Sequence, residues 1–209
     1  MIIDCISDLH GFRPNLKGGD LLIVAGDLTN SGLEFQYDNF YYWLKDQDYS
    51  KKIVVAGNHD GLLQGIGKEL VDQMFEGLSY LQDSGFDWHG LKIWGSPWTP
   101  TFQNWSFMKD RGEPIKKMWD LIPDDTNILI THGPPHGIFD KSALNNDFES
   151  VGCMDLANKV YTLKNLKLHV FGHIHEGYGI KVINHTTFVN CSLMDENYYT
   201  KNKPIRVIL

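Results

Sequence analysis

The sequence is short of positive charge, and of arginine in particular. It has three arginines, Arg13, Arg111 and Arg206, and a formal net charge of -7 at pH 7. Proteins that bind long nucleic acids through a broad basic surface obtain most of their non-specific affinity from Lys and Arg side chains that neutralise phosphates. The composition therefore argues against that class of protein, although it leaves room for a small phosphate compound. An anion site would draw its positive charge from these arginines, from lysines or from bound metal ions.

Cysteine is also scarce, and long apolar runs are absent. Cys5, Cys153 and Cys191 are odd in number and show neither C-x-x-C spacing nor a secreted disulfide pattern. We therefore expect them to be small buried hydrophobic residues. The N-terminal stretch lacks a basic region followed by an apolar one, and no run approaches membrane length. These absences predict a cytoplasmic protein without membrane association.

The chain also lacks low-complexity tracts, internal repeats and any Pro/Ser-rich linker that would divide it. It has 209 residues, of which 42% are hydrophobic, an ordinary globular composition that can form one sizeable core. We therefore predict a single domain over residues 1–209.

Five short apolar runs alternate with stretches of helical periodicity. The runs are rich in β-branched residues and end in glycine or turn residues, which is typical of buried strands. This alternation predicts an α/β domain with helices over a largely parallel sheet. Segments 86–95 and 178–192 resemble hairpins and 204–209 a last strand, which favours a mixed sheet or two packed sheets. The predicted strands are 2–7, 20–26, 51–57, 127–131 and 168–172, and the predicted helices are 34–47, 67–78, 113–122 and 153–166.

Polar side chains that could bind metal follow each of the five apolar runs. Loops that leave the carboxyl ends of strands form the ligand sites of open α/β sheets, so these side chains are expected to converge. Taken alone, each aspartate or asparagine could be a cap or turn residue, and each histidine a buried structural one. Capping does not explain why Asp, His and Asn recur after five strands, and imidazole and carboxylate suit Zn, Mn and Fe. The residues are Asp8, His10, Asp27, Asn58, His59, Asp60, His132, His173 and His175.

The order of these motifs, D-x-H, G-D, G-N-H-D, H-G-P-P and G-H-x-H, resembles that of the calcineurin-like metallophosphoesterase family. Longer stretches, among them KIVVAGNHD, THGPPHG and LHVFGHIHEGYG, are most similar to the metallophosphoesterase-domain subfamily of cyclic-nucleotide phosphodiesterases. The resemblance implies an α/β fold in which two β-sheets form a sandwich flanked by helices, in four layers αββα, and a pair of divalent metal ions. It further implies that Asp8, His10 and His175 hold one ion, that Asn58, His132 and His173 hold the other, and that Asp27 bridges both.

The function implied by the resemblance is hydrolysis of a small phosphodiester, such as a cyclic nucleotide, by a hydroxide that bridges the two metal ions. Two divalent cations lower the pKa of a shared water toward about 7 and stabilise the charge of in-line attack. The family's candidate acid for the leaving oxygen is His59, with Asp60 orienting its imidazole, although His59 could also simply pack. Manganese is the metal we expect to support activity in vitro, while iron and zinc suit the same ligands.

Three residues outside the motifs are weaker candidates for substrate contacts. Trp98 belongs to an aromatic stretch that could stack a base or merely pack over the sheet, and Arg13 or Arg111 could contact phosphate. The alternatives to a phosphodiesterase are a phosphomonoesterase, a nuclease of the same fold, and a catalytically silent scaffold. The complete ligand set, together with His59, argues against the scaffold. The expected partner is a small phosphodiester, with no extended nucleic acid and no membrane.

Overall fold

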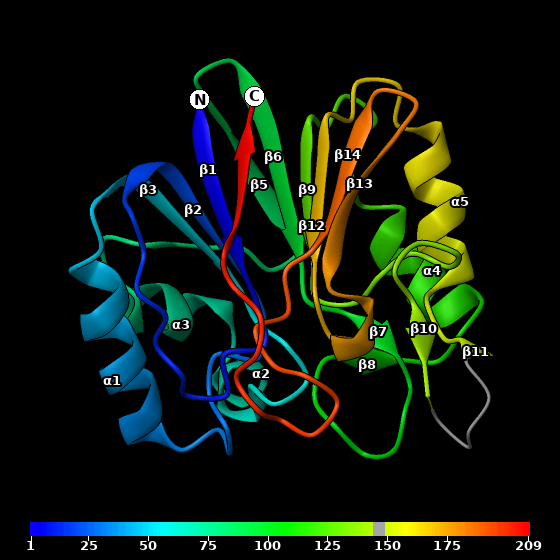
Figure 1. The fold of residues 1–209 in the computed structure, drawn as a ribbon. Helices are drawn as coiled ribbons and strands as arrows, with labels where there is room; N and C mark the ends of the chain where they lie inside the picture. The colour runs from blue at the N-terminus through cyan, green and yellow to red at the C-terminus, as the bar shows by residue number, and fades with distance from the viewer. Residues whose placement is uncertain (144–148) are drawn as a thin grey trace.

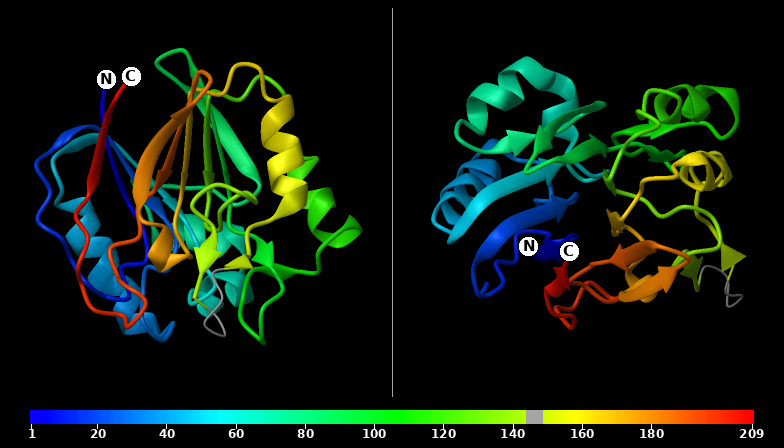
Figure 2. Two further views of the ribbon diagram at one scale, coloured as in Figure 1. Left: turned by 45° about the vertical axis from the view of Figure 1, so that its right-hand side comes forward. Right: turned by 90° about the horizontal axis from the view of Figure 1, so that it is seen from above.

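Two β-sheets pack face to face at the centre of the fold, and helices cover the outer face of each (Figure 1). The computed structural model describes residues 1–143 and 149–209. Seen from above, the chain forms four layers in the order helix, sheet, sheet, helix (Figure 2). The predicted α/β sandwich flanked by helices is therefore confirmed.

The first sheet contains β1 (Ile2–Ile6), β2 (Gly19–Ala25), β3 (Tyr49–Val55), β4 (Ser79–Tyr80) and β15 (Ile205–Ile208). The strand order is β15–β1–β2–β3–β4. Neighbours from β1 to β4 run parallel, and β15 joins the edge antiparallel to β1. The first three predicted strands thus form the centre of this sheet.

The second sheet contains β5 (Ser84–Trp88), β6 (Leu91–Ser96), β9 (Ile128–Thr131), β12 (Leu168–Phe171), β13 (Gly179–Ile183) and β14 (Thr186–Asn190). The strand order is β13–β14–β12–β9–β6–β5. The four inner strands are parallel, whereas β13 and β5 are antiparallel to their neighbours. The pairs β5–β6 and β13–β14 are the two predicted hairpins, which are confirmed.

Alternate residues of the strands form the core between the two sheets, because side chains two apart on a strand point to the same face. Ile23 of β2 and Val170 of β12, one from each sheet, are fully buried in this layer. Cys5 and Cys191 lie in the same layer, Cys153 lies in the other buried cluster, and all three thiols are free. The cysteines are buried hydrophobic residues, as predicted.

The outer faces of the sheets carry the helices (Figures 1 and 2). α1 (Glu34–Lys45) and α3 (Lys68–Met74) lie over the first sheet, α4 (Glu113–Trp119) and α5 (Met154–Thr162) lie over the second, and the short α2 (Gly61–Ile66) follows β3. α1 buries Tyr37, Phe40 and Leu44, whose spacing places them on one helical face. Each predicted helix forms but is shorter than expected; α3 stops at Met74 because Phe75 leaves the helical conformation. Among the described residues, no helix is both long and apolar enough to cross a lipid bilayer.

Loops at one end of the sandwich contain the remaining elements. β7 (Thr99–Pro100) pairs with β8 (Met108–Lys109), β10 (Lys141–Ser142) pairs with β11 (Glu149–Ser150), and η2 (His175–Gly177) is a short 3-10 helix. In Figure 1 these elements lie at the bottom, whereas the two ends of the chain lie together at the top. The carboxyl ends of β1, β2, β3, β9 and β12, and therefore the polar motifs, lie at the bottom end.

Candidate metal centre

The structure brings the predicted metal ligands of both sheets together at the carboxyl ends of the central strands. Asp8, Asp27 and Asn58 follow β1, β2 and β3, whereas His132 and His173 follow β9 and β12. Parallel neighbours end at the same edge of a sheet, so each sheet presents its polar side chains to the other at this end. The two remaining ligands come from the loop after β1 and from η2.

The first ligand cluster consists of Asp8, His10 and His175. One ligand atom from each of these side chains lies within 4.8 Å of the others. Nδ1–H of His175 donates to the backbone carbonyl of Asp195 at 2.8 Å, which leaves its Nε2 3.4 Å from Oδ1 of Asp8. A carbonyl on the outer nitrogen is the usual second contact of a metal-binding imidazole, because it fixes the tautomer. The cluster is therefore arranged to bind a cation through Nε2 and a carboxylate.

The second cluster is built around His132, which is fully buried. Its Nδ1–H donates to the carbonyl of Ala25 at 2.9 Å, and its Nε2 lies 2.9 Å from Oδ1 of Asn58 and 3.4 Å from Oδ1 of Asp27. The ring of His173 lies beside it, with 5.0 Å between the ring centroids. Asn58 and His132 thus adjoin through ligand atoms, whereas His173 adjoins His132 by its ring and belongs to none of the described groups whose ligand atoms lie within 4.8 Å of one another.

Asp27 lies between the two clusters. Its Oδ2 is 3.7 Å from Nε2 of His10, and its Oδ1 is 3.4 Å from Nε2 of His132. Ligand atoms of Asp8, Asp27 and His132 also lie within 4.8 Å of one another. A single carboxylate therefore reaches both clusters, which is the arrangement of a bridging ligand.

The side chain of His10 tests whether this centre fits a metal ion. Only 4% of that side chain is exposed, and neither of its ring nitrogens has a hydrogen-bond partner among the described residues. A buried polar atom without a partner costs about 1–3 kcal/mol. His10 shares its surroundings with the carboxylates of Asp8 and Asp27, which carry two negative charges in a buried volume. A divalent cation would satisfy the lone pair and both charges, so the donor set fits such an ion.

Charges within the centre shift the protonation of its residues. Burial, the largest influence, raises the pKa of Asp8 and Asp27, but the adjacent histidines outweigh it and hold both pKa values well below their usual range. Burial likewise lowers the pKa of His132 and His175, but Asp27 and Asp8 outweigh it and raise each pKa to about 9. The metal-free centre therefore holds carboxylate–imidazolium pairs at neutral pH, and a cation must displace their protons.

Four of the predicted ligands have a left-handed backbone, with φ of 51° at Asp8, 43° at His10, 53° at Asp27 and 67° at His173. Non-glycine residues rarely adopt this region, and each such residue costs of order 1–3 kcal/mol. Hydrogen bonds hold part of this backbone in place: the N–H groups of Leu9 and His10 both donate to the carbonyl of Asp27, at 2.9 and 3.0 Å. The strain is thus concentrated at the centre and offset by contacts between the loops after β1 and β2.

Glycines leave space for ligand side chains from other motifs. A Cβ on Gly57 would lie within 3 Å of the Asp27 carboxylate, and one on Gly172 would lie within 3 Å of the Asp8 carboxylate. A Cβ on the glycine before Asp27 would likewise lie within 3 Å of the ring of His132. In each G-D, G-N or G-H dipeptide, the second residue is therefore a predicted ligand, and the glycine leaves space for a ligand side chain that follows another strand.

His59 lies at the edge of both the centre and the neighbouring cavity. Its backbone N–H donates to Oδ1 of Asp27 at 2.8 Å, and its Nδ1–H donates to the carbonyl of Asn30 at 3.3 Å. Its ring packs on Trp105, with 4.3 Å between centroids and 32° between planes. A ring nitrogen also lies within 4.8 Å of ligand atoms of His10 and Asp27. This position suits a proton donor, and it also permits a ligand role.

Asp60 does not contact the imidazole of His59, contrary to the prediction. Its buried carboxylate instead accepts hydrogen bonds from the backbone N–H groups of Gly57 at 2.8 Å and Leu28 at 3.2 Å. Burial and a neighbouring carboxylate raise the pKa of Asp60 to about 7. Asp60 therefore ties the loops after β2 and β3 together, and the carbonyl of Asn30 orients the ring of His59.

A cavity of about 600 Å³ lies beside the two clusters. Its polar lining includes Asp27, Asn58, His59, His173 and His175. Its apolar lining includes Pro100, Phe102, Trp105, Pro134 and Tyr198. The candidate metal centre thus faces a space of small-molecule size with an apolar wall.

Of the two arginines predicted to contact substrate, one lines the cavity and the other does not. Arg111 lines the cavity, and its guanidinium donates to the carbonyls of Val151 at 2.6 Å and Gly152 at 2.8 Å. Arg13 is exposed and does not belong to the described lining. Only Arg111 is therefore placed to meet a molecule in the cavity.

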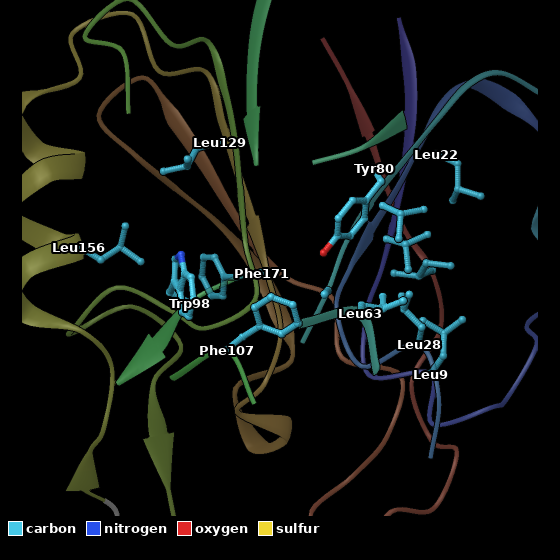
Figure 3. Close-up of a cluster of buried hydrophobic side chains, with 14 of the residues drawn as sticks. Leu9, Leu22, Leu28, Leu63, Tyr80, Trp98, Phe107, Leu129, Leu156 and Phe171 are labelled. Carbon is cyan, nitrogen blue, oxygen red and sulfur yellow. The ribbon is translucent and has the colours of Figure 1, made fainter. Parts of the chain in front are cut away.

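Trp98 packs below the surface instead of lining the cavity. It is 9% exposed, and its indole N–H donates to the carboxylate of Asp83 at 2.7 Å. Figure 3 shows it among buried side chains, next to Phe107 and Phe171, and the rings of Trp98 and Phe107 are 5.7 Å apart. Trp98 therefore packs over the sheet, which is the second of the two alternatives for this aromatic stretch, whereas Trp105 of the same stretch lines the cavity.

Sequence reasoning missed three residues at the centre. Asn30 orients His59, the carbonyl of Asp195 orients His175, and Tyr198 lies near both histidines. Two of the contacts use backbone carbonyls, which any residue type can supply, so no residue pattern could reveal them. Tyr198 comes from the segment after β14, which carries none of the metal-binding motifs.

The sandwich and the ligand clusters at its strand ends are those of a metallophosphoesterase. Residues 1–177 match the family described as calcineurin-like phosphoesterase, and the chain belongs to that family. It is 38% identical to human metallophosphoesterase domain-containing protein 1, over 98% of this chain and 70% of the relative. It is 35% identical to UPF0046 protein T07D4.2 of Caenorhabditis elegans, over 96% of this chain and 58% of that relative.

A solved structure shows the same fold at low sequence identity. Phosphopantetheinyl hydrolase (PptH) from Mycobacterium tuberculosis superimposes with a TM-score of 0.61 and 16% identity, over 97% of this chain and 95% of that one. At this identity the similarity concerns the fold alone. Family membership thus establishes the class of phosphoric ester hydrolases, and the substrate must be argued from the site.

Proposed function

We propose that this protein, as one domain, is a phosphodiesterase that hydrolyses small phosphodiesters, such as cyclic nucleotides, with two divalent metal ions. The observation that carries the proposal is the position of Asp27, whose carboxylate lies beside His10 of one cluster and His132 of the other. The unpartnered ring nitrogens of His10 support the metal requirement. The diester preference rests on the similarity of the motifs to those of the metallophosphoesterase-domain phosphodiesterases.

Two sets of side chains would hold the ions. Bound divalent cations supply Lewis-acid activation of water and neutralise charge on the phosphate. Manganese is our first choice in vitro, because carboxylate and amide oxygens suit it, and iron and zinc, which suit imidazole, are the alternatives. The first set is Asp8, His10 and His175, the second is Asn58, His132 and His173, and Asp27 belongs to both.

His59 is the proposed proton donor to the leaving oxygen. Because the carbonyl of Asn30 holds Nδ1–H, the other ring nitrogen, Nε2, is left for the substrate. Trp105 packs against the ring and restricts its rotation. A proton held at Nε2 of His59 would lie at the boundary between the metal ligands and the cavity, within reach of a leaving oxygen bound there.

The cavity supports a small substrate. A volume of about 600 Å³ lies within the range of small-molecule sites, and Arg111 adds one positive charge to a lining that also contains Glu176 and Glu196. The net charge of -7 disfavours a long polyanion, so a nuclease acting on duplexes is the weaker alternative. The three buried free thiols fit the reducing cytoplasm, where we place the protein.

The experiment that tests this function compares hydrolysis of bis-p-nitrophenyl phosphate and p-nitrophenyl phosphate in the presence of Mn²⁺, with Asp27→Asn as the blank. The proposal predicts faster diester hydrolysis that disappears in the variant along with bound metal. A monoester preference would show a phosphomonoesterase instead. Wild-type protein that binds Mn²⁺ but turns over neither substrate would indicate a silent scaffold.

A further inference from the structure

Tyr198 lies over the first ligand cluster although it comes from the C-terminal part of the chain. Its ring centroid is 4.9 Å from that of His10, 5.1 Å from that of His175 and 6.3 Å from that of His59, each in an edge-to-face arrangement. It also lines the cavity that contains Asp27. Tyr198 therefore lies beside three of the histidines proposed to act in catalysis, and it lies outside residues 1–177, which match the family.

The position of Tyr198 is fixed by contacts to the turn that also holds His175. The carboxylate of Asp195 accepts from the N–H groups of Asn197 at 2.9 Å and Tyr199 at 3.0 Å. The carbonyl of Asp195 accepts both from the N–H of Tyr198 at 2.9 Å and from Nδ1–H of His175 at 2.8 Å. The backbone of Tyr198 is left-handed, with φ of 61°. One turn thus orients a predicted metal ligand and places an aromatic ring beside it.

Three exposed aromatic side chains belong to the cavity wall. Phe102, Trp105 and Tyr198 are 42%, 43% and 54% exposed, although all three line the same cavity. Contiguous exposed apolar surface that is rimmed by polar residues usually marks a binding site. Here the polar neighbours are the proposed metal ligands, so the aromatic surface is placed to contact whatever is attached to the phosphate.

We infer that Tyr198 and Trp105, which line the cavity near His59, bind a flat aromatic substituent of the phosphodiester and select for it. The inference rests on the proposed function and adds the two side chains that select the substituent. Aromatic side chains stack on planar ring systems such as nucleobases with little dependence on hydrogen-bonding pattern. Tyr198 and Trp105, together the aromatic slot, therefore discriminate an aryl or heteroaryl diester from an alkyl diester through contact area.

The test compares two diesters with one leaving group, bis-p-nitrophenyl phosphate and methyl p-nitrophenyl phosphate, in the presence of Mn²⁺. The quantity measured is the ratio of kcat/KM for the aryl diester to kcat/KM for the methyl diester, relative to wild type. Tyr198→Ala should lower this ratio about tenfold or more, because only the aryl diester has a stacking contact to lose, and Trp105→Ala should lower the same ratio. Tyr198→Phe should retain it, because the ring and not the hydroxyl makes the contact.

The matched control is Tyr199→Ala, since Tyr199 is 72% exposed and is not among the described lining residues of the cavity. The control should leave the ratio unchanged. An unchanged ratio in Tyr198→Ala, or equal losses on both diesters together with lost metal, would overturn the inference and leave Tyr198 a structural support of His175.

Failure of the proposed function gives a different result, because wild-type protein would then hydrolyse neither diester. In that case the slot is tested by binding of phenylphosphonate and methylphosphonate to the Mn²⁺-loaded protein, measured by calorimetry. The inference predicts that wild type prefers phenylphosphonate and that Tyr198→Ala loses the preference. Equal binding of both ligands to wild type would refute the slot.

Discussion

Replacing Gly57 with alanine should weaken both the fold and metal binding, because the added methyl group has no space. A Cβ at this position would lie 2.7 Å from Cε1 of His132, and closer still to the carboxylate and backbone nitrogen of Asp27. Two of these three contacts involve backbone or a ring held by its own hydrogen bond, so the backbone and the carboxylate of Asp27 must both move.

The magnitude follows from what that movement breaks. Overpacking a core costs about 1–3 kcal/mol. Moving the carboxylate of Asp27 also breaks the hydrogen bond that it accepts from the N–H of His59 at 2.8 Å, worth about 1.5–3 kcal/mol for a charged acceptor. The sum is a loss of about 2.5–6 kcal/mol in the free energy of unfolding, and at about 2 °C or more per kcal/mol the Tm of the metal-free protein should fall by about 5 °C or more.

The assay is thermal unfolding of the metal-free protein by circular dichroism, together with the Mn²⁺ content after dialysis. Gly65→Ala is the control, because Gly65 lies in α2 and nothing lies within 4 Å of its added Cβ. That substitution should raise stability by up to about 1 kcal/mol, since alanine is the better helix former. A Gly57→Ala protein with wild-type Tm and full metal content would refute the packing argument.

Three further predictions concern other groups of the site. His59→Ala should slow hydrolysis of a diester with a poorly acidic leaving alcohol more than hydrolysis of bis-p-nitrophenyl phosphate, with metal content unchanged. Equal losses on both diesters would argue against a general acid, and lost metal would indicate that His59 is a ligand. Trp98→Phe removes the donor to Asp83 and should cost about 1–3 kcal/mol in unfolding free energy without changing KM, whereas a raised KM at wild-type stability would place Trp98 at the substrate. The folded-state pKa values of His132 and His175 are raised to about 9, so their contribution to the stability of the metal-free protein is fully present below about pH 6.5 and is lost as pH rises through 9. Chemical denaturation of the metal-free protein should therefore show the free energy of unfolding falling between pH 7 and 9. A flat profile over that range would contradict the pairing of these histidines with Asp27 and Asp8.

The strands were predictable because they are short, buried on both faces and therefore continuously apolar. The run 20–26 corresponds to β2, whose residues from Leu21 to Ala25 are all buried, and the run 168–172 corresponds to β12. The division into two sheets follows less directly from sequence, because pairing partners such as β9 and β12 are set by tertiary packing. The resemblance to a known family supplied that arrangement.

The metal ligands were predictable for a related reason, because the end of a strand fixes the position of the residue that follows it. What each neighbour contacts is set by the local turn. Asp60 follows His59 directly, yet it is the residue before α2 and its carboxylate turns toward Gly57. Tyr198 depends on a turn organised by Asp195, and no spacing rule connects it with the motifs.

The two sheets share the candidate metal centre, and this has a mechanical consequence. Apolar packing such as that of Ile23 and Val170 holds most of the sheet interface together, and this attraction is non-directional. Ions bound jointly by Asp27 of the first sheet and His132 of the second would act as a cross-link at one end of the sandwich. Metal-loaded protein should then show slower amide exchange than metal-free protein where β2 and β9 finish, and unchanged exchange at the end that carries the chain termini.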